Sequence, residues 1–202
     1  MYIPKYFKVT DIQEIKQFIQ QNAFATVVST HKNRPIAVHI PLQLISKDDG
    51  DYLTGHVAYG NPIWRTLQNN DEILVMFQGP HAYISSSWYE KENVPTWNYQ
   101  AVHIYGHATT FDGEALQQDL TSLLEKYEGH RERPVLWDTL SPELLEQELK
   151  GIVGIQIKIG EIQAAYKLSQ NRHAHDYEEI IKRLQEEPDT NSHAIAEVMK
   201  NK

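Results

Sequence analysis

The sequence predicts an α+β protein that is mainly β, built as a closed or partly open barrel with helices added to it. About six or seven strand-like segments are joined by short turns, and one helical segment is inserted after the third strand. The strand–helix alternation of a doubly wound sheet is absent. We expect one domain over residues 1–202, with the barrel over 1–112 and 151–172 and helical elements over 113–150 and 173–202.

The first part of the chain supplies most of the expected strands. A capping box at Thr10 and Gln13, followed by apolar residues at helical spacing, predicts an opening helix over residues 10–21. Asn61 and Pro62 favour the start of a short helix, as N-cap and first helical residue. The expected strands cover residues 24–30, 36–45, 52–57, 72–77, 82–87 and 96–111, the first two forming a hairpin.

The second part of the chain is mostly helical. Asp112 and Ser141 are favoured capping residues, and each precedes a helical pattern. The expected elements are helices over 113–127 and 141–151, a strand over 152–159 that continues weakly to 168, and helices over 176–186 and 192–200.

Composition excludes several classes of protein. The chain of 202 residues has no cysteine, which excludes disulfide scaffolds, thiolate zinc sites and cysteine nucleophiles. Its 19 basic and 27 acidic residues give a formal net charge of -8, which argues against a large nonspecific phosphate-binding surface. The longest apolar run, from Ile73 to Phe77, is far shorter than the roughly 20 residues of a membrane helix, and the first seven residues lack a signal-peptide pattern. We expect a soluble, cytoplasmic protein.

The familiar catalytic motifs are absent. There is no glycine-rich phosphate loop, Gly-x-Ser-x-Gly elbow or His-Glu-x-x-His motif, so hydrolase and kinase chemistry have no support. His103 and His107 would share one face of a strand, but no carboxylate stands at a diagnostic spacing from them. We expect these histidines to bond to neighbours or solvent, and we expect no metal site.

Three segments could contact a ligand, and each has a plain structural alternative. From Gly55 to Arg65, a strand, a tight loop and a capped helix present an arginine, which suits a phosphate or is an ordinary solvated turn. The aromatic run from Trp88 to Tyr99 suits a planar ligand such as flavin or haem, or a core cluster or dimer interface. The polar run 167–172 suits an anion, or is a solvated strand end.

These segments carry a resemblance to a known family. Together they resemble the PaiB family, also described as FMN-binding negative transcriptional regulators, over nearly the whole chain, in order and at similar spacing. The matching segments are Met1-Tyr2-Ile3-Pro4-Lys5-Tyr6-Phe7, His39-Ile40-Pro41-Leu42, Gly55-His56, Asn61-Pro62, Gln78 to Tyr89, Val94 to Tyr99 with Ala101-Val102-His103, and Lys167 to Arg172.

The resemblance implies an FMN-binding split β-barrel, usually a homodimer with flavin sites at the subunit interface. It also implies a repressor of protease production and sporulation in spore-forming bacteria. Carried over by position, His39 would face the flavin phosphate from the second strand. The phosphate-side loop would consist of Gly55, His56, Asn61 and Arg65. The ring or partner-subunit side would consist of Trp97, Asn98, Lys167 and Arg172.

The chain departs from the family pattern at three places. Tyr59 stands where a basic residue is expected, Ser86 where proline is usual, and Ala164-Ala165 where Gly-Lys is expected. Losing two cations should weaken FMN binding. One hypothesis is therefore a scaffold whose ancestral ligand site has decayed.

Two further functional hypotheses remain. No acid, base or nucleophile stands beside the aromatic run, which favours a regulator without turnover. The alternative is a flavin-dependent oxidoreductase, or a haem-binding or haem-degrading protein that uses His56, His103 or His107. With neither a helix-turn-helix nor a basic stripe in the sequence, direct DNA contact is weakly supported, and regulation through a partner protein or a signal molecule is an alternative.

Overall fold

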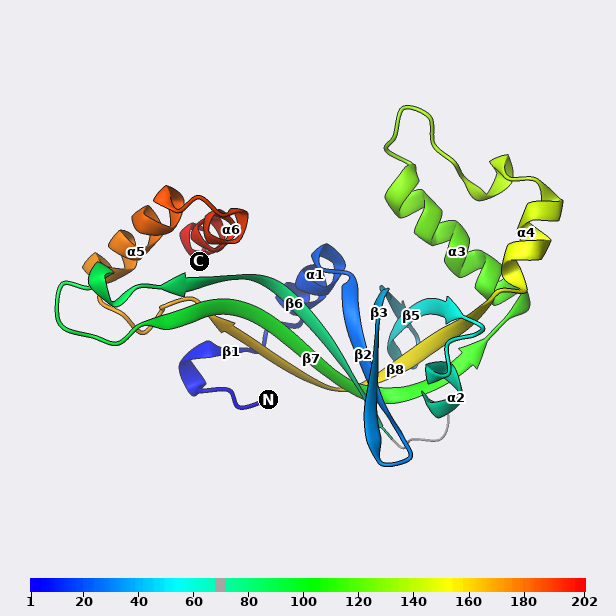
Figure 1. Cartoon of the computed structure of the whole chain (residues 1–202), viewed down its shortest axis with the longest axis horizontal. Helices are drawn as coiled ribbons and strands as arrows, with labels where there is room; N and C mark the ends of the chain where they lie inside the picture. Colours follow the sequence, from blue (N-terminus) through cyan, green and yellow to red (C-terminus); the bar gives the residue numbers. More distant parts are fainter. Residues whose placement is uncertain (68–71) are drawn as a thin grey trace. The chain divides into compact units, whose positions relative to one another are not determined.

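A computed structural model describes residues 1–67 and 72–202. Its strands form a largely antiparallel sheet in the order β3-β2-β6-β7-β8-β5-β4, and β1 pairs with β8 (Figure 1). The strands are β1 (Lys8–Val9), β2 (Phe24–His31), β3 (Arg34–Pro41), β4 (Gln43–Lys47), β5 (Gly50–Ala58), β6 (Ile73–Ile84), β7 (Thr96–Phe111) and β8 (Ile152–Lys167). The α-helices are α1 (Ile12–Gln21), α2 (Ile63–Leu67), α3 (Gly113–Glu128), α4 (Pro142–Leu149), α5 (Ala174–Glu186) and α6 (Thr190–Lys200), and the 3-10 turns are η1 (Lys5–Phe7), η2 (Ser86–Trp88) and η3 (Trp137–Thr139).

The expected hairpin is confirmed. β2 and β3 pair antiparallel from Phe24↔Pro41 to His31↔Arg34, joined by Lys32 and Asn33, whose φ angles are 48° and 61°. Two successive residues with positive φ make the turn whose twist matches that of paired strands. This register places His39 opposite Thr26.

Tertiary contacts divide the chain into two compact units. The first unit consists of Met1–Asn22, Phe77–His103 and Gln163–Lys202, and the second of Ala23–Met76 and Ile104–Ile162. In the first unit, α5 packs beside α6 and contacts η2 (Figure 1). Its core joins apolar residues of α1, β7, β8, α5 and α6: Ile15, Phe18, Ile19, Val102, Tyr166, Ile180, Leu184, Ile195 and Met199. In the second unit, the core lies mainly between strands: Val27, Leu53, Val57, Val75, Ile104, Ile155 and Ile157.

Two of the expected strands are in fact one. β6 runs without a break through Gly79 and Pro80, where the turn signal predicted separate strands over 72–77 and 82–87. In the described part of the chain, the pairing of β2 with β6 ends at Met76. Beyond this point β6 has a free edge, which tolerates a proline that cannot donate a ladder hydrogen bond. A Cβ at Gly79 would overlap the Phe18 ring at 2.7 Å, so the glycine lets α1 pack closely.

Three other expectations about the elements were wrong. Asp11, and not Thr10, caps α1, accepting from the backbone N–H groups of Gln13 and Glu14. The strand expected over 36–45 is broken at Leu42, which is buried and whose N–H bonds to the Ala23 carbonyl. The strand expected over 82–87 gives way at Ser85 to the η2 turn. Across residues 1–67 and 72–202, no helix combines the length and the apolar character needed to cross a membrane.

Candidate functional site

A tight loop leads from β5 into α2 in the second unit. The Asn61 N–H donates to the Ala58 carbonyl at 2.9 Å, which closes the turn. The Asn61 side chain accepts from the Ile63 N–H at 3.0 Å, as a helix cap does. Asn61 is therefore used to shape the loop that carries Arg65.

The Arg65 guanidinium lies against two aromatic rings. It stands 4.1 Å from the Trp64 ring centroid and 5.5 Å from that of Tyr59. The two rings are 5.7 Å apart, and the Trp64 indole N–H donates to the Tyr59 carbonyl at 2.9 Å. Arg65 and Tyr59 are exposed, so these contacts hold a planar cation at the surface in a restricted orientation. We call Tyr59, Trp64 and Arg65 the arginine platform.

His39 lies on the outward face of the β2–β3 hairpin. Its ring stacks on Phe24 with centroids 6.2 Å apart, and its Nδ1 is hydrogen-bonded to the Thr26 hydroxyl at 2.9 Å. Both His39 and Phe24 are exposed. The imidazole is thus fixed in place with its other nitrogen open to further contacts.

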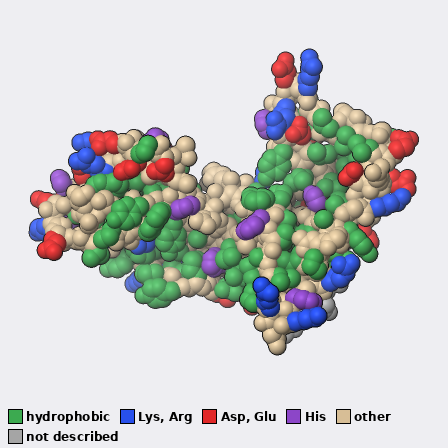
Figure 2. All heavy atoms as spheres, in the orientation of Figure 1, with side chains coloured by type: hydrophobic (Ala, Val, Ile, Leu, Met, Phe, Trp, Pro, Cys, Tyr) green, Lys and Arg blue, Asp and Glu red, His purple; other side chains and the backbone are tan. Residues whose placement is uncertain are grey.

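Gly55 and His56 occupy successive positions of β5 and point to opposite sides. A Cβ at Gly55 would overlap the Pro41 carbonyl and a Leu42 methyl group at 2.8 and 2.9 Å, so close packing of the chain requires glycine here. His56 is half-buried and lines an apolar cavity of about 250 Å³ together with leucines of α3 and α4 (Figure 2 shows the apolar side chains gathered there). Burial lowers the pKa of His56, and the Asp119 charge opposes this shift.

Asp119 is a buried group that the sequence did not identify. Its Oδ1 accepts from the Thr54 hydroxyl and from the Gln43 amide, the latter at 3.1 Å. Its Oδ2 has no hydrogen-bond partner among the residues that the structure describes. Burial raises the pKa of Asp119, while Thr54, His56 and Gln43 act in the other direction. The only sequence signal was its place on the inner face of an amphipathic helix.

The aromatic run in the first unit does not form one cluster. Trp97 is 53% exposed, and its ring lies 6.0 Å from those of His81 and Tyr83. Tyr89 is instead buried, and the Arg172 guanidinium covers its ring at 4.8 Å. Trp97 and Tyr83 therefore offer an open aromatic surface, while Tyr89 and Arg172 form a separate contact.

Two further predicted residues, Asn98 and Lys167, form hydrogen bonds between β7 and the end of β8 or the turn that follows it. Asn98 is fully buried and is bonded to the Ser169 hydroxyl. Lys167 donates to the Thr96 hydroxyl. Burial lowers the pKa of Lys167, and the neighbouring Arg172 charge adds to the effect. These contacts give Asn98 and Lys167 structural tasks, and their cofactor-binding roles stay predictions.

The predicted residues thus fall into two groups that the structure describes separately. The second unit contains His39, Gly55, His56, Asn61 and Arg65, and the first contains Trp97, Asn98, Lys167 and Arg172. Within residues 1–67 and 72–202, no group of three or more His, Asp or Glu side chains could hold a metal ion.

Comparison with known proteins decides the family. Residues 1–161 match the family model described as a "Putative FMN-binding domain". The chain is also 61% identical over 202 residues, covering 100% of this chain and 98% of the relative, to the "Protease synthase and sporulation protein PAI 2" of Bacillus subtilis (strain 168). The chain belongs to the PaiB family.

Solved structures with the same fold confirm the expected split barrel. The FAD and heme binding protein from Mycobacterium smegmatis aligns with a TM-score of 0.59 at 17% identity, covering 79% of this chain and 73% of the other. The flavocytochrome Anf3 from Azotobacter vinelandii aligns with a TM-score of 0.60 at 15% identity, covering 88% and 78%. At these identities the likeness shows the fold alone.

The structure gives a physical account of two departures from the expected PaiB pattern. Tyr59, in place of a basic residue, is part of the arginine platform and helps to orient Arg65. Ala165, in place of a lysine, is 1% exposed on β8 and pairs with Lys8 of β1. A lysine at position 165 would have to be buried, so the alanine here fits the packing of β1 on β8.

Proposed function

We propose that this chain is a flavin-binding regulator of the PaiB type, with FMN as the flavin, that represses protease production and sporulation. The observation that carries the proposal is the 61% identity over the full chain to the Bacillus subtilis protein named for protease synthesis and sporulation. The match to an FMN-binding family over residues 1–161 supports the choice of cofactor.

The arginine platform has the chemistry that a flavin phosphate needs. A guanidinium presents paired donors in one plane, and these match two oxygens of a phosphate group. Stacking on Trp64 and Tyr59 restricts the orientation of Arg65 before any ligand arrives, which lowers the entropic cost of binding. Position 59 therefore lacks the basic side chain expected in the family. Instead, the Tyr59 ring holds the neighbouring Arg65 guanidinium in an orientation suited to phosphate binding.

His39 is proposed as a second phosphate-side residue. Thr26 and Phe24 hold its ring on the exposed face of the hairpin, and its remaining ring nitrogen can bond to an oxygen of the ligand. For the ring or partner-subunit side we retain Trp97, whose exposed face suits stacking on a planar heterocycle. A bound flavin supplies hydride and electron chemistry, so the protein itself has only to bind and orient it.

We propose that this protein regulates its target genes without binding DNA directly. Residues 113–202 carry 11 basic and 17 acidic residues, and residues 1–112 carry eight and ten, so neither part supplies the excess positive charge that nonspecific DNA binding uses. Regulation is proposed to run through a partner protein or a signal molecule. Retardation of promoter DNA in a gel shift, weakening steeply as salt is raised, would contradict this part of the proposal.

We propose a homodimer in solution. Large apolar side chains are exposed in both units, among them Phe24 at 69% and Trp97 at 53%. Single exposed aromatic residues are common, but paired ones such as Trp97 with Tyr83 are typical of interfaces. Light scattering combined with size-exclusion chromatography should give twice the 23.4 kDa chain mass, and a monomer at all concentrations would contradict the proposal.

The regulatory role can be tested in the organism of the relative. A Bacillus subtilis strain that lacks its own PAI 2 protein should return to normal secreted protease activity when it expresses this chain. Arg65→Met should fail to do so and should bind FMN about 10- to 100-fold more weakly, because one charge-assisted phosphate contact is lost.

Arg133→Met is the matched control for Arg65→Met. Arg133 lies in the segment joining α3 to α4, whose tip carries charged side chains in Figure 2, and it is exposed. It should bind FMN and repress like the unchanged chain. A strain that shows no change in protease activity with the unchanged chain would contradict the proposed function.

A further inference from the structure

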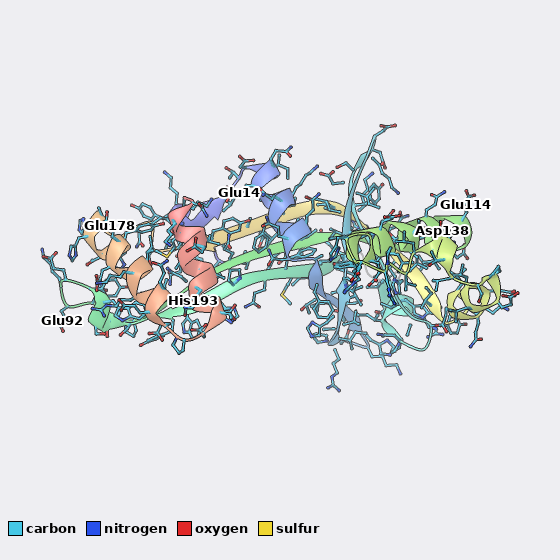
Figure 3. The ribbon with its side chains drawn as sticks, turned by 90° about the horizontal axis from the view of Figure 1, so that it is seen from above. Glu14, Glu92, Glu114, Asp138, Glu178 and His193 are labelled. Atoms are coloured by element: carbon cyan, nitrogen blue, oxygen red, sulfur yellow. The ribbon has the colours of Figure 1, made fainter. Side chains whose placement is uncertain are left out.

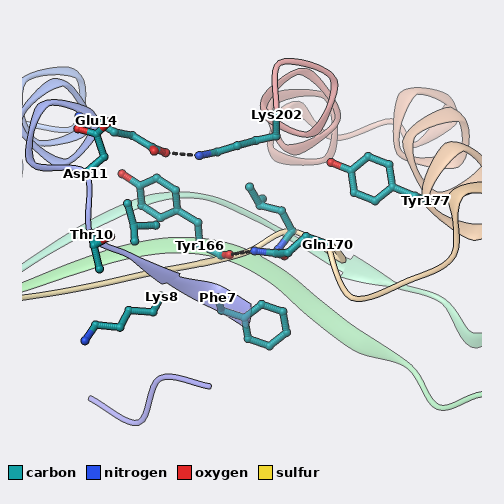
Figure 4. Close-up of a pocket in the computed structure, with 11 residues that line it drawn as sticks. Phe7, Lys8, Thr10, Asp11, Glu14, Tyr166, Gln170, Tyr177 and Lys202 are labelled. Atoms are coloured by element: carbon teal, nitrogen blue, oxygen red, sulfur yellow. Dashed lines mark hydrogen bonds and ion pairs between the residues drawn. The ribbon is translucent and has the colours of Figure 1, made fainter. Parts of the chain in front are cut away.

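A cavity in the first unit lies between η1, β1, the start of α1 and the end of β8 (Figure 4). Its volume of about 390 Å³ lies within the range of small-molecule sites. None of its lining residues was singled out as a flavin contact. The lining residues are Phe7, Lys8, Val9, Thr10, Asp11, Glu14, Tyr166, Leu168, Gln170, Tyr177 and Lys202.

Tyr166 brings an unused polar group to this cavity. The residue is 2% exposed, and its hydroxyl has no hydrogen-bond partner within residues 1–67 and 72–202. In Figure 4 the hydroxyl points toward the side of the cavity formed by Asp11 and Glu14. Buried hydroxyl groups are bonded in the large majority of proteins, because leaving one unpaired costs free energy. Burial also raises the pKa of Tyr166, and the nearby Glu14 charge adds to this, so the phenol stays a neutral O–H donor.

An ion pair spans the cavity above the Tyr166 ring. Glu14 of α1 and Lys202 beyond α6 form it, and Figure 3 shows Glu14 on the side of α1 near α6. The Lys202 ammonium lies 5.3 Å from the Tyr166 ring centroid. A neighbouring cavity of about 450 Å³ is lined by the same three residues. The pair therefore stands where two cavities meet.

The Gln170 and Tyr177 side chains, which also line the cavity, already form hydrogen bonds within the protein. Gln170 donates to the Tyr166 carbonyl and accepts from the Leu168 N–H, and the Tyr177 hydroxyl donates to the Met199 carbonyl. Recognition of a ligand is thus left to the Tyr166 and Thr10 hydroxyls and to the charged residues. These comprise two cations and two anions: Lys8, Lys202, Asp11 and Glu14.

We propose that this cavity binds a small zwitterion, a free α-amino acid with an apolar side chain. The ligand carboxylate accepts from the Tyr166 hydroxyl and exchanges with Glu14 as the partner of Lys202. Its ammonium group is held by the Glu14 carboxylate and by Oδ2 of Asp11, because Oδ1 of Asp11 caps α1. The apolar side chain lies against the apolar part of the lining: Phe7, Val9 and Leu168.

The charges that line the cavity favour a zwitterion over a ligand with a single negative or positive charge. A plain anion would approach Lys202 but would be repelled by Glu14 and Asp11, and a plain cation would meet the opposite problem. A zwitterion satisfies both signs and leaves no charge unpaired in a partly enclosed space. The inference does not depend on flavin binding, because it uses none of the proposed flavin residues.

The probe is L-leucine, and it is compared with two analogues that each lack one of its charged groups. Calorimetric titration of the full chain should show L-leucine binding with a rise in the thermal midpoint. The compounds 4-methylpentanoate, which lacks the ammonium group, and 3-methylbutylamine, which lacks the carboxylate, should each bind at least about tenfold more weakly. The absence of both binding heat and a thermal shift up to about 10 mM L-leucine would overturn the proposal. An affinity for 4-methylpentanoate or 3-methylbutylamine equal to that for L-leucine would also overturn it.

Two tyrosine variants separate recognition from folding. Tyr166→Phe removes only the unpaired hydroxyl, so it should weaken L-leucine binding at least about tenfold. Without ligand its thermal midpoint should be unchanged or higher, because a buried unpaired group has been removed. Tyr89→Phe is the control: it removes another buried hydroxyl that has no partner among the described residues, and Tyr89 does not line this cavity. Its thermal midpoint should likewise be unchanged or higher, and it should bind L-leucine within about twofold of the unchanged chain. L-leucine binding that survives Tyr166→Phe unchanged would overturn the assignment.

Discussion

The side chains of Asn98 and Ser169 exchange two hydrogen bonds inside the first unit. The Asn98 amide donates to the Ser169 hydroxyl at 3.0 Å, and that hydroxyl donates back to the Asn98 carbonyl oxygen at 3.1 Å. Ser169 has a φ of 60°, an uncommon backbone conformation for serine. Its carbonyl accepts from the Arg172 N–H at 2.9 Å. The pair therefore fixes the turn that follows β8.

Asn98→Ala is expected to destabilise the protein by about 2–4 kcal/mol, because it leaves the buried Ser169 hydroxyl without its partner and opens a cavity. Urea unfolding followed by circular dichroism measures the change. Asn93→Ala is the control. Among the residues that the structure describes, the half-buried Asn93 side chain bonds just to the adjacent Val94 N–H, so the change should be within about 0.5 kcal/mol. Equal stability of the two variants would show that the pair does not fix this turn.

Gly106→Ala is expected to be strongly destabilising. Gly106 lies buried in β7 where a Cβ would overlap the Lys158 carbonyl oxygen and touch an Ile157 methyl group. Backbone cannot yield as a flexible side chain can, so we expect a loss of about 3 kcal/mol or more, or an insoluble product. Gly60→Ala is the control: apart from Gly60 itself and its two neighbours in the chain, no heavy atom of residues 1–67 and 72–202 lies within 4 Å of the added methyl, and its thermal midpoint should change little.

Asp119 should make the protein less stable as the pH rises. Its folded-state pKa lies above the unfolded value because burial opposes ionisation, so its favourable contribution is complete below the unfolded pKa and is lost as the pH rises through the folded pKa. Asp119→Asn keeps an oxygen for Thr54 and Gln43 but cannot ionise. Its stability relative to the unchanged chain should therefore increase as the pH rises from about 4 to about 7. Urea midpoints for both proteins at several pH values measure this difference, and a difference that does not change with pH would contradict the assignment.

Two of the departures from the PaiB pattern, Tyr59 and Ala165, should respond differently to an added lysine. Ala165→Lys would place an ammonium group at a 1% exposed position, and we expect it to lower the free energy of unfolding by several kcal/mol. Tyr59→Lys is exposed and should leave stability within about 1 kcal/mol. FMN titration of Tyr59→Lys then tests the decayed-site hypothesis. A large gain in affinity would support decay, and a loss would support the arginine platform.

Local patterns predicted much of the fold because they act over short distances. The β2–β3 hairpin follows from alternating apolar residues around Lys32 and Asn33, and β7 from a long aromatic and β-branched run. The capping residue of α1 was misassigned because Thr10 and Asp11 are both good caps, and only the backbone path selects Asp11. The need for glycine at position 79 of β6 comes from the close approach of Phe18 of α1, which no local rule contains.

The candidate site was harder to predict because its contacts join distant positions. Arg65 could be identified from its place after Asn61, but its stacking on Tyr59 could not. Asp119 has partners 65 and 76 positions away, so its burial becomes visible only when the chain has folded. Tyr166 likewise meets Glu14 and Lys202 from both ends of the chain, and a single tyrosine in a strand pattern indicates nothing about them.

The absorbance spectrum of the purified protein, before and after titration with FMN, tests the central claim most directly. We expect a flavin spectrum in the protein fraction that saturates on titration, with FMN released on denaturation and bound about 10- to 100-fold more weakly by Arg65→Met. A colourless protein that takes up no flavin at saturating FMN, or one that shows a Soret band of haem instead, would contradict it.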